Sequence, residues 1–245
     1  MDLRGIELIG CIFFAAALYS SVGHAGASGY LAAMALFAVP QATMKPSALV
    51  LNIFVAIIGS IRFVAARAFS FGLFLPLALG SVPAAFFGGR LKIPEQYYRV
   101  LIAIALLFAA FRLAFGVLFK DRIRYQEPSF WLLILVGIAI GFLSGLTGVG
   151  GGIYLTPIIL LSGWAPAKTA AGVSVTFILV NSISGLLGQA SKKLELPPEI
   201  WYWIAAAILG GLLGSYVGVS KFGETGLRRM LAVVLVIAAA KLLVS

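Results

Sequence analysis

The sequence is short of charge, of acidic residues and of the side chains that hold metals. Only 11% of its 245 residues are charged and 62% are hydrophobic, whereas soluble domains carry about a quarter charged residues. The single cysteine, Cys11, excludes an internal disulfide and any multi-cysteine metal site. A single histidine also argues against haem-ligand pairs and di-metal centres, so we expect no metal or cofactor. This composition indicates an integral membrane protein.

The charges that remain are mostly basic and peripheral. The chain has 18 Lys and Arg against 8 acidic residues, for a net charge of +10. In a soluble protein this excess would suggest nucleic acid, but here most basic residues fall at the ends of apolar segments, where lipid headgroups lie. We therefore expect a lipid bilayer and no nucleic acid as partner. All acidic residues are assigned to termini and connectors: Asp2, Glu7, Glu95, Asp121, Glu127, Glu195, Glu199 and Glu224.

Hydropathy predicts a chain of membrane helices. A helix needs about 20 apolar residues to cross the hydrocarbon, and the first two segments and the sixth and seventh are shorter than the others. Residues 6–18 resemble the core of a signal peptide, but the same pattern recurs at 130–154, where no signal peptide can lie. The predicted segments are 6–20, 29–38, 46–66, 71–89, 97–118, 130–145, 152–163, 168–189, 199–219 and 226–244.

Two glycine-rich segments interrupt this apolar sequence at matching places. One runs from Ser144 to Tyr154 (SGLTGVGGGIY), and a degenerate copy runs from Ser20 to Tyr30 (SSVGHAGASGY), roughly half the chain earlier. A break in a membrane helix is costly, because unpaired backbone groups find no water in lipid. Paired, Gly-interrupted segments are typical of transporters built from internal repeats, which bind their substrate between the repeats.

The repeat divides the chain into two halves. Residues 120–129 are the most polar connector and separate an N-terminal repeat, 1–119, from a C-terminal repeat, 130–245. Each half has a broken pair followed by three longer helices. The number of crossings is odd whether the short segments cross or are re-entrant, so the second half is inverted. Lys120, Arg122 and Arg124 place the connector in the cytoplasm. The predicted fold is an all-α polytopic membrane protein with two inverted structural repeats.

The second glycine-rich element carries a family resemblance. The run from Gly145 to Pro157, GLTGVGGGIYLTP, together with the two-half architecture, resembles the sulfite exporter TauE/SafE family over nearly the whole chain. The first-half copy departs from the usual pattern at His24, Ala27 and Ser28. The resemblance implies transport of sulfur oxyanions, such as sulfite and sulfonates, or of small organic anions across the bacterial inner membrane.

The residues themselves also favour an anion. The segments 29–38 and 152–163 begin at the breaks, so the N–H groups at their N-termini can face a ligand and attract negative charge. Glycines that serve only helix packing are the alternative. The hydroxyls can donate to an oxyanion or bond back to their own helix, and the two asparagines can bind substrate or join helices. The candidate substrate-binding residues are Ser20, Ser21, Gly23, His24, Gly26, Ser28, Asn52, Ser144, Thr147, Gly148, Gly150, Gly151, Gly152, Ser174 and Asn181.

Three further residues have open roles. His24 is the only histidine, and it can couple transport to protons, donate a hydrogen bond to the anion, or cap the break. Lys45 and Lys168 follow the broken pairs and can attract substrate, although contact with lipid headgroups is the favoured interpretation. The serines and threonines of 168–189 make this segment polar, so we expect it to face the interior.

No pattern indicates catalysis. The glycine run lacks the Lys-Ser/Thr of a nucleotide-binding loop, and no HExxH or GxSxG is present. The favoured function is a secondary transporter or facilitator for small anions. A membrane-embedded enzyme and a non-transporting subunit are the alternatives, and the sequence leaves a homo-oligomer open.

Overall fold

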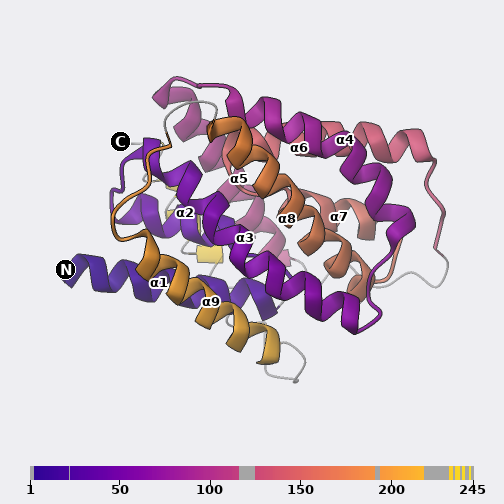
Figure 1. Cartoon of the computed structure of the whole chain (residues 1–245), viewed down its shortest axis with the longest axis horizontal. Helices are drawn as coiled ribbons and strands as arrows, with labels where there is room; N and C mark the ends of the chain where they lie inside the picture. The colour runs from indigo at the N-terminus through magenta and orange to yellow at the C-terminus, as the bar shows by residue number, and fades with distance from the viewer. Residues whose placement is uncertain are drawn as a thin grey trace.

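The chain folds as a helical bundle whose long axis follows most of its helices (Figure 1). The computed structural model describes residues 3–21, 23–115, 125–190 and 194–217, and beyond these residues 232, 233, 235–237, 239, 240 and 243. Within these ranges it has helices and no strand, as predicted. The helices are α1 (Leu3–Ser21), α2 (Ala27–Leu36), α3 (Gln41–Ala65), α4 (Phe71–Arg90), α5 (Glu95–Phe115), α6 (Phe130–Thr147), α7 (Gly152–Ser162), α8 (Ala167–Ala190) and α9 (Ile200–Val217).

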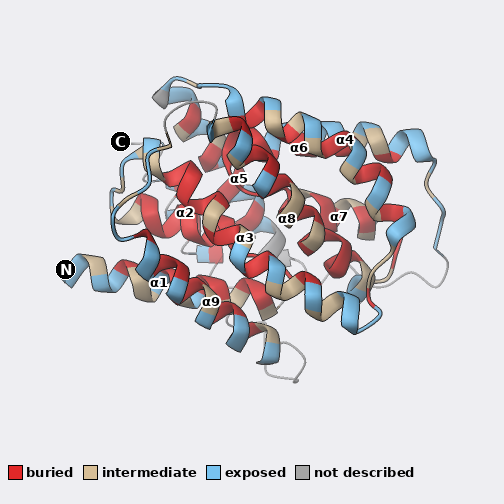
Figure 2. Ribbon diagram, viewed as in Figure 1, coloured by how far each residue is buried: buried red, intermediate tan, exposed pale blue. Residues whose placement is uncertain are grey.

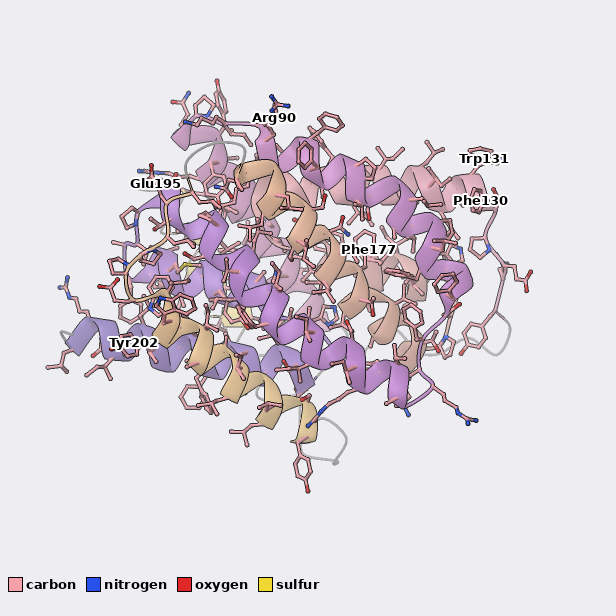
Figure 3. All side chains as sticks on the ribbon, in the orientation of Figure 1. Arg90, Phe130, Trp131, Phe177, Glu195 and Tyr202 are labelled. Carbon is pink, nitrogen blue, oxygen red and sulfur yellow. The ribbon has the colours of Figure 1, made fainter. Side chains whose placement is uncertain are left out.

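The bundle has the surface of a membrane protein. Helices α1, α3, α4, α6 and α8 are long and apolar enough to cross a bilayer. Large apolar side chains are exposed along the outer faces of the helices, where Figure 2 shows pale blue and tan. Exposed aromatic residues lie near both ends of the bundle, with Phe130 and Trp131 at one end and Tyr202 toward the other (Figure 3). Aromatic residues concentrate at membrane interfaces, so this is an integral membrane protein.

Both short helices turn back along their partners. A Cβ added at Gly29 of α2 would lie 2.7 Å from the Cβ of Ala15 and 3.0 Å from the ring of Tyr19, both in α1. In the second half, Gln126 N–H, just before α6, donates to Gly163 O, just after α7, at 2.8 Å. The second broken pair therefore ends close to where it began, and in the first pair α2 starts back along the end of α1.

Helices α3 and α8 run antiparallel through the centre of the bundle. Gly172, near the start of α8, packs on Ala68 and Phe63 at the end of α3. Their polar side chains point inward, which confirms the prediction for the eighth segment. Asn52, Ser174, Asn181 and Ser182 are fully buried.

Two glycine seams join helices from different halves. In the first, Gly141 and Gly145 of α6 pack directly on the backbone carbonyls of Ser81 and Ala85 in α4. In the second, Gly210 and Gly214 of α9 pack on those of Phe13 and Ala17 in α1. Small residues allow such close backbone approach in membrane bundles. They fix α4 against α6 and α1 against α9, and so hold both broken pairs in place.

Some predictions need correction. Helix α3 begins at Gln41, not 46, and contains Pro46. Pro46 lies in the second turn and removes one backbone hydrogen bond, that to the carbonyl of Ala42, and the helix continues past it. Glu7 was assigned to a terminus but lies within α1, where it is exposed. Lys120, Arg122 and Arg124 of the connector, and most of 226–244, lie outside the described residues.

Candidate functional site

The second break is built from glycines in the left-handed conformation. Helix α6 ends at Thr147 and α7 begins at Gly152. Between them, Gly148, Gly150 and Gly151 have φ of 80°, 83° and 83°, a region that other residues rarely adopt. Gly151 is the N-cap of α7 and provides no side-chain cap. The N-terminus of α7 therefore faces the protein interior with its first N–H groups outside the helical hydrogen-bond pattern.

The first break is more closely bonded to itself. Helix α1 ends at Ser21 and α2 begins at Ala27, with Gly23 and Gly26 at φ of 77° and 104°. The hydroxyl of Tyr30 donates to Ala25 O at 2.6 Å, and that of Ser28 donates to Tyr19 Oη at 2.6 Å. Both predicted interruptions are confirmed as breaks in the backbone.

His24 connects the first break to the second half. Its Nε2 lies 3.0 Å from Thr156 Oγ1, and this hydroxyl also lies 2.7 Å from Ser174 Oγ and 3.1 Å from Gly152 O. A hydroxyl carries one proton. When Thr156 donates to the Gly152 carbonyl, it therefore accepts from His24 and Ser174. His24, Thr156 and Ser174 are all buried, so this network links the first break with α7 and α8 inside the bundle.

Asn52 lies beside the second break with unused bonding capacity. Its amide donates to Val149 O and to Ser182 Oγ, both at 3.4 Å, which is long for such bonds. Asn52 Oδ1 and Ser144 Oγ are buried and have no hydrogen-bond partner. Buried polar atoms usually have one, because leaving them unpaired costs about 1–3 kcal/mol each. The Asn52 amide nitrogen lies beside Gly150 and Ser144 Cβ beside Gly151, so these two side chains can contact a polar ligand there.

Three other predicted site residues donate hydrogen bonds within their own helices. Ser21 donates to Leu18 O and Thr147 to Leu143 O, and the Asn181 amide donates to Phe177 O. These are bonds within one helix, the alternative noted for hydroxyls above. Ser20 is buried and faces α9, since a Cβ added at Gly211 would lie 3.6 Å from Ser20 Oγ. Its Oγ has no hydrogen-bond partner, but it lies on the α9 side of the first break and not beside the second break. The structure therefore does not gather all candidates around one point.

Sequence reasoning missed three residues near the second break. Thr156 lies one helical turn after Gly152. Its position within the glycine-rich element could have identified it as a candidate site residue. Ser182 contacts Asn52 across the bundle, which no local pattern predicts. Lys45 was assigned to lipid headgroups, and this is wrong. It is only 7% exposed, and its ammonium donates to Gly89 O at 3.2 Å and Gly88 O at 3.4 Å.

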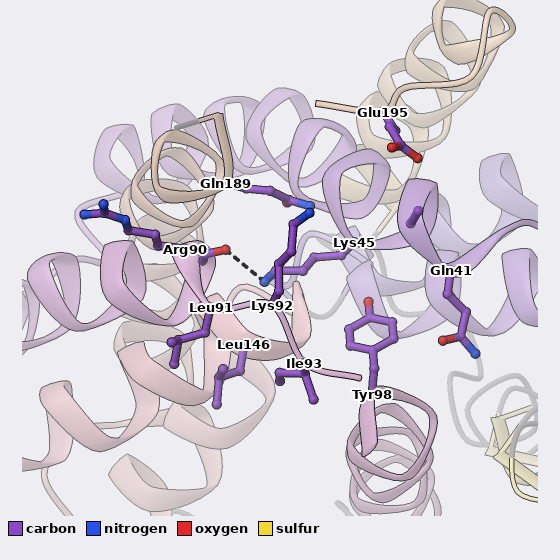
Figure 4. A pocket seen from close by; sticks show the side chains of 12 residues that line it. Gln41, Lys45, Arg90, Leu91, Lys92, Ile93, Tyr98, Leu146, Gln189 and Glu195 are labelled. Carbon is purple, nitrogen blue, oxygen red and sulfur yellow. Dashed lines mark hydrogen bonds between the residues drawn. The ribbon is translucent and has the colours of Figure 1, made fainter. Parts of the chain in front are cut away.

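A cavity of about 310 Å³ opens at one end of the bundle next to the second break (Figure 4). Leu146 lines it, and the hydroxyl of Tyr98 donates to Thr147 O at 3.3 Å. Helices α3, α4, α5, α6 and α8 and the connectors after α4 and α8 supply its walls. The lining residues are Gln41, Ala42, Lys45, Gly89, Arg90, Leu91, Lys92, Ile93, Tyr98, Leu146, Gln189 and Glu195.

The interior favours binding over bond-making chemistry. In the described part of the chain, no three His, Cys, Asp or Glu side chains lie together. Among the buried polar residues of that same part there is no carboxylate. What the second break presents is helix N–H groups, hydroxyls and an amide, all enclosed by a membrane bundle. A helical membrane protein with paired broken helices and a polar interior of this kind belongs to the class of membrane transporters.

Comparison with known proteins specifies the family. The profile of the sulfite exporter TauE/SafE family matches residues 8–242, and the chain belongs to this family. The probable membrane transporter protein y4hK of Sinorhizobium fredii is 35% identical over 99% of this chain and 100% of its own length. The probable membrane transporter protein YunE of Bacillus subtilis is 25% identical over 73% of this chain and 72% of its own. No solved structure matches. The protein is thus a membrane transporter and not an enzyme.

Proposed function

We propose that this transporter is a secondary carrier or facilitator for small anions, namely sulfur oxyanions or organosulfonates, in the bacterial cytoplasmic membrane. The observation that carries the proposal is the second break. There, the N-terminus of α7 follows a left-handed glycine without a side-chain cap. Asn52 and Ser144 flank it with buried atoms that have no partner.

The charge preference follows from the groups that the break presents. Helix N-terminal N–H groups and the helix dipole favour negative charge. The Ser144 hydroxyl can donate to an oxyanion, and the Asn52 amide, held by two long bonds, can turn toward one. A cation site in a membrane interior would normally include a carboxylate, and none is among the buried polar residues described. The alternative, that the glycines serve packing alone, does not account for three left-handed glycines in one turn.

We also propose that the halves 1–119 and 130–245 are inverted repeats. The antiparallel course of α3 and α8 supports this, because these helices hold corresponding places in the two halves. The two glycine seams also support it. In each seam the fourth helix of one half packs on the first helix of the other, α4 on α6 and α9 on α1. The halves should superpose after a two-fold rotation about an axis in the membrane plane. Transport would draw on a gradient, because the sequence has no nucleotide-binding loop.

Flux into proteoliposomes tests the proposal. Vesicles containing the purified protein should take up sulfite, and chloride and potassium should pass much more slowly. The same uptake assay with taurine and other sulfonates would show which further substrates the protein accepts. Selective flux of a cation would contradict the anion site. Absence of flux for every small anion tested would favour a non-transporting subunit.

A further inference from the structure

We propose that the cavity beside the second break is an anteroom that binds a small oxyanion between Lys45 and Lys92 before it reaches the break. The proposal depends on the proposed function in one respect only, namely that the bound anion moves on from the cavity to the second break. The anion binding itself follows from the cavity's charge and geometry.

Cations dominate the walls of the anteroom. Lys45, Arg90 and Lys92 line it, against one carboxylate, Glu195. In Figure 4 the side chains of Lys45, Lys92 and Gln189 point into the same space, whereas the Arg90 head group points away. Two lysines and an amide can thus converge on one anion. The cavity's volume of about 310 Å³ leaves room for a small hydrated oxyanion or the head of a sulfonate.

The two lysines stand at different depths. Lys92 is exposed and lies in the connector after α4, whereas Lys45 is buried in the second turn of α3. The Lys45 ammonium bonds the carbonyls of Gly88 and Gly89 at the C-terminal end of α4, and the dashed line in Figure 4 marks one of these bonds. Its distances, 3.4 and 3.2 Å, lie at or beyond the long end of the 2.7–3.2 Å range of N–H···O bonds, and bonds from an ammonium to an oxyanion are shorter, at 2.7–2.9 Å. An oxyanion offers shorter bonds and can therefore compete for this ammonium.

The stem of Lys45 forms the wall between the anteroom and the second break. A Cβ added at Gly148 would lie 3.1 Å from Lys45 Cγ and 3.2 Å from Lys45 O. Leu146 and Tyr98 complete this wall, and the Tyr98 hydroxyl bonds the last carbonyl of α6. An anion that draws the Lys45 ammonium from α4 thus acts on the side chain that packs against the glycine turn. This arrangement couples occupancy of the anteroom to the break.

Lys168 is the counterpart of Lys45 in the second half, and the two lysines differ in exposure. Lys168 follows the second broken pair as Lys45 follows the first, yet Lys168 is exposed at the start of α8. The two lysines therefore make a matched pair for experiment, one inside a cavity and one outside. Glu195 supplies a second control of opposite sign, because its removal should make the cavity more attractive to anions.

Sulfite binding to the full-length protein in nanodiscs of phosphatidylcholine tests the anteroom. By calorimetry, Lys92→Gln should weaken binding roughly fivefold, the effect of losing one partly exposed charge pair. Glu195→Gln should strengthen it by a few-fold, and Lys168→Gln should leave it unchanged. Lys45→Gln should weaken sulfite binding further than Lys92→Gln does. Because Lys45 is buried, Lys45→Gln can disrupt folding, and in that case the result for Lys92→Gln decides the test. Equal affinities for all variants, or an equal loss in Lys168→Gln, would overturn the proposal.

A lipid phosphate has the same chemistry as a free oxyanion and is distinguished by lipid composition. Native mass spectrometry of the protein in phosphatidylglycerol should show the same bound lipid for wild type and Lys92→Gln. Loss of that lipid in Lys92→Gln, with sulfite affinity unchanged, would assign the cavity to a headgroup and overturn the substrate role.

Flux separates this proposal from the proposed function. If sulfite is not transported but its binding still depends on Lys92, the transport proposal fails and the anteroom stands. If sulfite is transported and Lys92→Gln alters neither the binding affinity nor the KM of flux, the anteroom fails and the transport proposal stands.

Discussion

The two breaks have the same outline but differ in how well their polar groups are satisfied. In the first, Tyr30, Ser28 and His24 N–H make hydrogen bonds of 2.6, 2.6 and 2.9 Å within the segment and its helices. In the second, Gly148 N–H donates to Ser144 O at 2.8 Å, but the side chains that reach the turn from other helices, the amide of Asn52 and the hydroxyl of Tyr98, do so only at 3.4 and 3.3 Å. Short bonds hold a backbone in one arrangement, and long ones leave it able to accept a ligand.

This difference suggests that the two breaks have different roles. The first break is a rigid support that directs His24 at Thr156 in the second half. The second break, with its three left-handed glycines, is the place where a ligand meets the backbone. A site that used both breaks equally would not leave one closed on itself. We therefore expect mutations at the second break to affect transport and mutations at the first to affect stability.

Gly150→Val should have the largest effect. A Cβ at this position would lie 2.8 Å from Asn52 Nδ2 and 2.8 Å from Ile178 Cγ2, at a φ that valine does not adopt. Displacement of the binding groups by about 1 Å should reduce flux about 100-fold, by analogy with misplaced groups in enzymes. Gly10→Val is the control, because a Cβ there meets nothing within 4 Å. Equal sulfite flux in the two variants, measured at equal membrane insertion, would refute a ligand at this turn.

Thr156→Val should come next and tests the link between the halves. Valine keeps the shape but removes the hydroxyl that joins His24, Ser174 and Gly152 O. Losing these hydrogen bonds costs about 0.5–1.5 kcal/mol each, and we expect flux to fall about tenfold. Thr176→Val is matched, since the Thr176 hydroxyl donates to Gly172 O of its own helix. A similar loss in both variants would mean that the network has no special role.

His24→Gln distinguishes the three roles of this residue. Glutamine retains a hydrogen-bonding group, so a hydrogen-bonding role predicts affinity within about threefold of wild type and an unchanged pH profile. Proton coupling predicts that the dependence of flux on pH between about 5.5 and 7.5 is lost, because an ordinary histidine changes charge there. A structural cap predicts a lower melting temperature with unchanged affinity. We expect the last result, because Nε2 is bonded to Thr156 and the first break is the one expected to affect stability.

Tyr30→Phe and Ser144→Ala should have the smallest and opposite effects. Tyr30→Phe removes a 2.6 Å bond in the first break and should lower the free energy of unfolding by about 1–2 kcal/mol, with sulfite KM unchanged. Ser144→Ala removes a hydroxyl without a partner and should leave stability unchanged but raise KM a few-fold. Thermal unfolding and flux kinetics on both variants would show whether stability and binding separate as the comparison requires.

Much of this fold was readable from the sequence, for physical reasons. Hydropathy locates membrane helices because lipid tolerates few polar groups, and glycine runs mark breaks because only glycine adopts the required φ. The start of α7 at Gly152 is the predicted one. The start of α3 was missed, because a proline reads as a helix stop whether or not it lies in the first turns.

The site was less predictable because its partners come from distant helices. Ser182 meets Asn52, and Thr156 meets His24, only because α7 and α8 pack against α2 and α3 in the folded bundle. Lys45 was misread because a lysine near a segment end usually reaches the membrane surface. Here the end of α4 covers it and offers carbonyls to its ammonium. Neither the contacts between distant helices nor the burial of Lys45 can be predicted from the neighbouring residues in the sequence.

Diffraction from crystals soaked in selenite, a heavier analogue of sulfite, tests most directly whether the second break binds the anion. The account predicts an anomalous selenium peak between the N-terminus of α7, Asn52 and Ser144, and its loss in Gly150→Val. A peak at the first break, or none anywhere near Gly150 at a selenite concentration that saturates transport, would contradict it.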